Sequence, residues 1–314
     1  QQIISRNAKA KMLYKSGDSL MIQSCFFTLN EQNKEITINA IKKGAEYVPF
    51  IDSYFQVYVF APVLTWEFGT PNPYFTYEVG TAQEQKKASF QSMNFYDPAI
   101  YAKFQSIGAV HPFVQIASLV NKVNRMELTE GEVANVLKKT IDQSKPLLVD
   151  MASFDFLTLD GEARKVVISP KLLAYAAASS GESDYDNISI LSDLRPKTMR
   201  ETQEQIAADA YLSEMARNME LRNKEKRGTK AYAEIQLDLN EMRLNQIDAV
   251  ALSQVQQTTI YPDSNRVTMY KNRDLGFRGW LVAGKLELHT NFSKFDYEAF
   301  KINLLSTDEA SLRV

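Results

Sequence analysis

The sequence is poor in cysteine and histidine, and neither sign of charge dominates it. A single cysteine, Cys25, among 314 residues excludes an internal disulfide framework. Its place in an apolar run with Phe26 and Phe27 favours a buried structural thiol over a nucleophile. The formal net charge is −2, so no global field attracts nucleic acid or an anionic membrane. No apolar run reaches about 18 residues, so no segment is expected to cross a membrane as a helix.

The common catalytic and nucleotide-binding motifs are also missing, among them Gly-x-Gly-x-x-Gly, the Walker A loop, His-Glu-x-x-His and Gly-x-Ser-x-Gly. The residue types allow a two-histidine metal site, but His111 and His289 carry no supporting flanking motif. The favoured interpretation is one histidine at a helix entry, before Pro112, and one in a strand. The acidic segments 160–162 and 184–186 lack the alternating ligand spacing of a calcium loop and indicate surface turns. The sequence therefore predicts no catalytic residue, no cofactor and no metal.

The chain opens with Gln1-Gln2-Ile3 and has no initiator methionine. Two origins remain open at this point: a segment of a longer protein, or a mature chain after removal of a secretory signal. The last residues, 311–314, resemble the middle of a strand, which favours a longer parent chain.

Two regions, residues 1–92 and 231–314, show the alternation of apolar and polar residues that is typical of half-buried strands. Ile36 and Ile38 are separated by a polar residue in the first region, and so are Ile235 and Leu237 in the second. Turn-forming residues separate such segments at intervals of about 8–12 residues. We expect strands from residue 12 onward, arranged as a sandwich, a barrel or a β-solenoid.

The region between them, residues 93–180, follows the order of a winged-helix domain: three helices and then a β-hairpin. The expected elements are a helix over 110–123, a helix from the capping box of Thr129 and Glu132 to about 139, a helix capped by Asp142 or Ser144, a hairpin over 156–168 and a helix over 170–179. The fold class is therefore α+β, with solenoid- or sandwich-like β-rich regions on either side of a winged-helix domain.

The third helix of this domain lacks the charge of a DNA reader. Such a helix needs lysine or arginine for phosphate contacts, yet residues 142–160 hold four aspartates against Lys145 alone. Leu147, Leu148 and Met151 are expected to be buried. Val149 and Phe154 are expected nearer the outer face. Lys145, Val149 and Phe154 are therefore candidate protein-contact residues, and no specific nucleic-acid partner is expected.

Residues 181–230 are expected to be a charged linker and helix. The stretch 180–195 is rich in serine and acidic residues and indicates irregular structure. Residues 197–227 contain seven basic and six acidic residues, a mixture that favours a solvated helix over a nucleic-acid arm.

Three stretches carry a family resemblance: 92–96 with 110–112, the hairpin with 169–172 and 183–186, and 270–277 with 283–285 and 295–301. They resemble segments of very large exported proteins of Bacteroidota, in which long β-rich regions are interrupted by a winged-helix-like unit. Segment 197–227 has no counterpart in that pattern. The resemblance implies a scaffold of the cell envelope and brings no catalytic residue with it.

We therefore expect a non-enzymatic structural or protein-interaction component of the bacterial cell envelope, exported to the periplasm or associated with the outer membrane. Its expected partners are other envelope proteins or neighbouring segments of a longer parent chain. The competing hypotheses are a DNA-binding regulator that uses the winged helix and a hydrolase with an unrecognised site.

Overall fold

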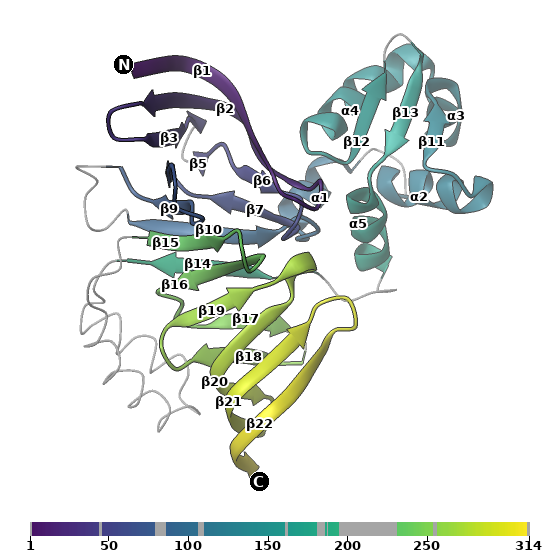
Figure 1. The fold of residues 1–314 in the computed structure, drawn as a ribbon. Helices are drawn as coiled ribbons and strands as arrows, with labels where there is room; N and C mark the ends of the chain where they lie inside the picture. Colours follow the sequence, from purple (N-terminus) through teal and green to yellow (C-terminus); the bar gives the residue numbers. More distant parts are fainter. Residues whose placement is uncertain are drawn as a thin grey trace. The chain divides into compact units, whose positions relative to one another are not determined.

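The computed structural model describes residues 2–43, 46–78, 86–105, 110–160, 163–180, 186, 188–194, 231–253 and 256–312. The chain divides into two compact units (Figure 1). Unit 1 consists of Gln1–Ser92 together with Ile188–Val314, and unit 2 is Met93–Asn187. Both β-rich regions of the sequence thus belong to unit 1, and unit 2 is inserted between them.

In its described residues, unit 1 consists of β-strands joined by turns, with one short 3₁₀ helix (η3). Its strands are β1 (Gln2–Leu13), β2 (Ser19–Asn30), β3 (Glu35–Ala40), β4 (Lys42–Lys43), β5 (Glu46–Tyr47), β6 (Phe50–Asp52), β7 (Val57–Phe60), β8 (Val63–Glu67), β9 (Tyr74–Thr76), β10 (Lys87–Ser92), β14 (Ser189–Asp193), β15 (Ala231–Gln236), β16 (Glu241–Asn245), β17 (Val250–Ser253), β18 (Thr258–Pro262), β19 (Arg266–Met269), β20 (Leu275–Ala283), β21 (Leu286–Asp296) and β22 (Lys301–Leu312), and η3 is Lys271–Arg273. All of these strands except β4 and β5 join one network of 17 strands.

The network has two branches that leave β2 at different positions along its length. The first runs β2-β3-β8-β9-β15-β16-β19-β20, and the second runs β2-β6-β7-β10-β14. An isolated bridge from Ser192 to Ile247 links β14 to the segment before β17. Since β17 pairs with β18 and β18 with β20, both branches lead to β20, which continues into β21 and β22.

Apolar side chains from the two branches meet in one core. The ring of Phe75 on β9 lies 5.2 Å from Phe50 on β6 and 6.3 Å from Phe90 on β10, both edge-to-face. All three rings are fully buried. Burial of a side chain of this size stabilises the fold by about 1.5–3 kcal/mol, so such contacts hold the two branches together.

The predicted β-rich character is confirmed, and the sheets are large and antiparallel. A β-solenoid stacks successive turns through parallel strands. Every pairing among the strands described for unit 1 is antiparallel, so the solenoid alternative is wrong.

Two further expectations about strands are corrected. Strands were expected only from residue 12, but β1 begins at Gln2 and pairs with β2 along its whole length. Its outer side chains are charged, which weakens the apolar signal. The stretch 180–195 was expected to be irregular, yet β14 lies within it. Ile190 on β14 is fully buried and pairs with Phe90, so contact with a distant strand determines this element.

Unit 2 contains five helices and a small sheet among its described residues. The elements are α1 (Pro98–Lys103), α2 (Pro112–Val123), β11 (Glu127–Thr129), α3 (Glu130–Val136), α4 (Ile141–Ser153), β12 (Leu157–Asp160), β13 (Lys165–Ile168) and α5 (Pro170–Ser180). The sheet is antiparallel in the order β11-β13-β12. Helices α2 to α5 and the hairpin fall where the sequence predicts them, whereas α1 and β11 were not expected.

Helix starts in unit 2 follow local capping chemistry. The predicted capping box is confirmed: the Thr129 hydroxyl accepts from the Glu132 backbone N–H, and the Glu132 carboxylate accepts from the Thr129 backbone N–H. The expected cap of α4 by Asp142 or Ser144 is wrong. Thr140 caps α4 through a second box with Gln143, because Thr-x-x-Gln supplies the same reciprocal hydrogen bonds.

The core of unit 2 is aromatic. Phe113 is fully buried and packs against Phe156, whose ring centroid is 4.4 Å away. Leu148 and Met151 of α4 are buried as predicted, whereas Leu147 is only half-buried. The predicted helix over 197–227 lies outside the described residues.

Candidate functional site

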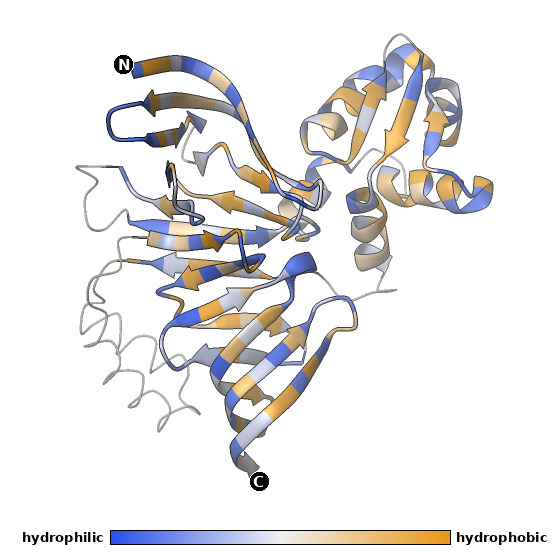
Figure 2. Cartoon of the chain, in the orientation of Figure 1, coloured by the Kyte–Doolittle hydropathy of each residue, from blue (hydrophilic) through white to orange (hydrophobic). Residues whose placement is uncertain are grey.

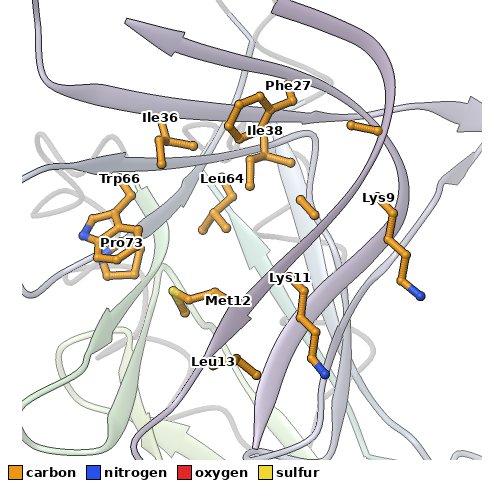
Figure 3. A pocket seen from close by; sticks show the side chains of 12 residues that line it. Lys9, Lys11, Met12, Leu13, Phe27, Ile36, Ile38, Leu64, Trp66 and Pro73 are labelled. Atoms are coloured by element: carbon orange, nitrogen blue, oxygen red, sulfur yellow. The ribbon is translucent and has the colours of Figure 1, made fainter. Parts of the chain in front are cut away.

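An apolar groove opens beneath β1 in unit 1 (Figure 3). Its volume is about 510 Å³, within the range of about 300–1,000 Å³ typical of ligand pockets. Strands β1, β2, β3 and β8 and the turn before β9 contribute its lining, which is Ala8, Lys9, Ala10, Lys11, Met12, Leu13, Phe27, Ile36, Ile38, Leu64, Trp66 and Pro73. Because the side chains that face the groove are apolar, it suits aliphatic or aromatic groups.

The two lysines on β1 do not point into the groove. Figure 3 shows the Lys9 and Lys11 side chains directed away from the apolar cluster. Alternation along the strand accounts for this, since Ala10 and Met12 pair with Ile22 and Leu20, which are buried. Strand β1 therefore presents an apolar side toward the groove and a basic side to solvent.

Strand β1 is also the end of a sheet. Among the described residues it pairs with β2 alone. Its other edge therefore offers backbone N–H and C=O groups to an added strand. A free edge beside an apolar groove is the arrangement in which β-strand addition supplies affinity through the main chain and specificity through side-chain pockets.

In unit 2, two of the three predicted contact residues lie together. Lys145 and Val149 lie one turn apart on the exposed side of α4, and Val149 is 59% exposed. Ile141, one turn before Lys145, is exposed too. This side of α4 thus presents two apolar side chains to solvent.

Phe154, the third predicted contact residue, turns inward. It is half-buried at the end of α4, and its ring lies edge-to-face with Phe104 at 5.6 Å. The Lys103 ammonium lies 4.3 Å from the centre of the Phe154 ring. These contacts leave less of Phe154 available to a partner than of Val149.

Several basic side chains of unit 2 are engaged by carboxylates. The Lys145 ammonium lies 3.4 Å from Asp142, and the Lys165 ammonium lies 2.6 Å from Glu127. Arg125 pairs with Glu132. Such pairs reduce the positive charge that α4 and the hairpin present to a phosphate backbone.

The two histidines are held in structural contacts, one in each unit. His111 caps α2: its Nδ1 accepts from the Phe113 backbone N–H, and its Nε2 donates to the Tyr101 carbonyl at 2.8 Å. Burial lowers the pKa of His111, which favours this neutral form. In unit 1, Nε2 of His289 lies 3.0 Å from Asp263.

Cys25 is fully buried, as the sequence predicts, and its thiol donates to the Ala8 carbonyl at 3.2 Å. Burial raises the pKa of Cys25, so the unreactive thiol form is favoured. In the part of the chain that the structure describes, no three metal-ligating side chains come together.

The buried ionisable pair Tyr14–Asp52 is a structural feature. The Tyr14 hydroxyl donates to one Asp52 oxygen at 2.6 Å, and the backbone N–H groups of Tyr54 and Phe55 donate to the other. Burial raises the pKa of Tyr14 and raises that of Asp52 to about 6. The pair closes the turn after β6 against the end of β1.

Sequence reasoning missed the groove and the β1 edge. A signal was present, since residues 8–12 alternate between small or apolar residues and lysine. The groove, however, requires β1, β2, β3 and β8 to lie side by side in one sheet, and no local sequence pattern encodes that arrangement.

None of the helices described is long and apolar enough to cross a membrane. No protein-family model, no curated protein and no solved structure matches the chain.

Proposed function

We propose that this chain is a non-enzymatic structural or protein-interaction component of the bacterial cell envelope. The main support for a role in protein interaction is the unpaired edge of β1 with the apolar groove beside it. An added strand would form main-chain hydrogen bonds along β1 and bury apolar side chains in the groove. The placement in the envelope rests on the resemblance to exported Bacteroidota proteins.

Within this proposal, unit 2 is a winged-helix-like domain used for protein packing. Its support is the element order α2-β11-α3-α4-β12-β13 with a three-stranded antiparallel sheet. Exposed Ile141 and Val149 on α4 suit an apolar protein contact better than a phosphate-lined groove.

Fractionation of the native host combined with photo-crosslinking tests the function. A photo-reactive amino acid replaces Lys9 on β1 or, as the control, the exposed Lys122 of α2. We expect the protein in the envelope fraction, with adducts to envelope proteins or to itself from the Lys9 position only. A purely cytosolic pool would contradict the envelope assignment, and equal adducts from both positions would contradict the β1 surface.

The DNA-binding alternative makes a separate prediction. We expect the full chain to show no submicromolar binding to random or selected duplexes in fluorescence anisotropy at low salt. The reason is that phosphate contacts need free basic side chains, whereas Lys145 and Lys165 already face carboxylates. Tight binding with a steep salt dependence would favour the regulator, and its loss in a K138E/K139E variant would locate the DNA on unit 2.

A further inference from the structure

Unit 1 has two long free edges of equal length. Strands β1 and β22 each span 12 residues, and among the described strands β1 pairs only with β2 and β22 only with β21. Exposed apolar residues recur along both edge strands, as Figure 2 shows in orange. They include Ile3 and Ile4 on β1 and Leu304, Leu305 and Leu312 on β22. A long edge of this kind is a template for another strand.

The two edges carry opposite charge. Strand β1 holds Arg6, Lys9 and Lys11, all exposed, and no acidic residue. Strand β22 begins with the exposed Lys301 and holds two exposed acidic residues, Asp308 and Glu309, near its other end, so the part that would pair with the β1 lysines is acidic. Basic residues on an edge disfavour pairing between two β1 strands, because like charges would then lie side by side. They do not disfavour pairing with an acidic strand.

The charged and apolar faces of β22 also correspond to those of β1. On β22, Glu309 lies opposite His289, whereas Leu304 lies opposite the buried Ser293, so Glu309 and Leu304 point to opposite faces. On β1, Lys9 and Met12 likewise point to opposite faces. Directly opposed residues of an antiparallel pair share a face. An antiparallel pairing that sets Glu309 opposite Lys9 therefore turns Leu304 toward the apolar side and places it opposite Tyr14, just past the end of β1.

We propose that β22 of one copy of this chain pairs antiparallel with β1 of a second copy, in a register that sets Glu309 beside the β1 lysines and Leu305 beside Leu13 at the end of the groove. The contact joins two different surfaces, so a pair of copies keeps one free β1 and one free β22. Such a head-to-tail contact propagates into a filament or closes into a ring. This inference deepens the proposed structural function, on which it rests, by naming a second copy as the partner.

Charge reversal on each edge tests the proposal on the purified full chain. Sedimentation velocity over a range of concentrations should show species beyond the dimer for the wild type. K9E/K11E makes both edges acidic, and E309K/S311K makes both edges basic. We expect each variant alone to assemble about tenfold more weakly, because every head-to-tail junction then joins like charges. The E309K/S311K variant leaves the contact between Asp308 and His289 unchanged.

Mixing the two variants is the decisive step. In an equimolar mixture every junction between unlike copies joins opposite charges, so assembly should return to near the wild-type level. The control K122E/K138E changes two exposed lysines of unit 2, on neither edge strand, and should assemble as the wild type does. Fluorescence of Trp66 and Trp280, both in unit 1, verifies that each variant is folded.

A wild type that stays monomeric at all concentrations would overturn the proposal, as would variants that assemble normally alone or a mixture that fails to recover. A monomer would leave the envelope and crosslinking results of the proposed function standing. Conversely, a cytosolic pool would contradict that function without changing the assembly measured in vitro.

Discussion

The Gly279→Ala variant is expected to lose about 3–5 kcal/mol of unfolding free energy. Gly279 lies in β20 at a register irregularity and has a φ of +142°, a conformation that residues with a side chain rarely adopt. A Cβ at this position would lie 2.3 Å from the Tyr261 carbonyl oxygen and 2.7 Å from the Asp263 nitrogen. Both obstacles are backbone atoms, one in β18 and one in the residue that follows it, so backbone strain and overpacking add together.

Two glycines with open surroundings separate these effects. Gly284 has a φ of +58°, and a Cβ added there would meet no atom within 4 Å, so Gly284→Ala should cost only the conformational strain, about 1 kcal/mol. Gly131 lies in α3 with open space and an ordinary φ, so Gly131→Ala should stabilise that helix by up to about 1 kcal/mol. Denaturant unfolding followed by tryptophan fluorescence reports on unit 1, and hydrogen exchange reports on α3. A Gly279→Ala protein as stable as Gly284→Ala would refute the steric argument.

The Asp52→Asn variant is expected to be more stable than the wild type at neutral pH, by up to about 3 kcal/mol. Desolvation raises the pKa of Asp52 in the folded protein from 3.8 to about 6, although three hydrogen bonds to the carboxylate oppose the shift. Each pKa unit corresponds to about 1.4 kcal/mol, so the ionised form costs the folded state this amount above pH 6. Asparagine keeps an oxygen for the two backbone N–H donors and carries no charge.

The pH dependence has a definite sign. Because the folded pKa is raised, the folded state binds the proton more tightly, and the penalty fades as pH falls through about 6 toward about 4. The difference in unfolding free energy between Asp52→Asn and the wild type should shrink by about 1 kcal/mol between about pH 7 and about pH 5. Asp238→Asn, at an exposed turn, is the charge-matched control and should follow the wild-type profile. A constant difference across this range would show that Asp52 titrates normally.

The free edges give unit 1 a physical reason to act as an assembly module. Most proteins shorten or cover the outer strands of a sheet, whereas β1 and β22 are among the longest strands described in this chain. Their charges permit pairing between unlike edges and disfavour pairing between like ones, which is a simple source of specificity. The exposed side of α4, with Ile141 and Val149, is the surface of unit 2 that we propose for a different contact.

Local chemistry along the sequence determined much of unit 2. The capping box of Thr129 and Glu132, the Asp160 turn and the 3.6-residue periodicity around Leu148 and Met151 act within a few residues, so the helices and the hairpin could be predicted. The exposure of Lys145 and Val149 follows from the same periodicity. Phe154 departs from it because it follows the last turn of α4, where Phe104 from a distant segment packs on its ring.

Only the tertiary structure decided how the β-rich regions combine. Strand β9 pairs with β15, which lies more than 150 residues later in the chain, and β14 forms because Ile190 is buried beside Phe90. Such pairings depend on long-range contacts and leave no periodic signal of their own. The groove beneath β1 and the steric clash that a side chain at Gly279 would make also result from contacts between segments distant in the sequence. The sequence alone thus determined most of the strand segments, with β14 and the first residues of β1 as exceptions, and long-range packing determined those exceptions and which edges remain free.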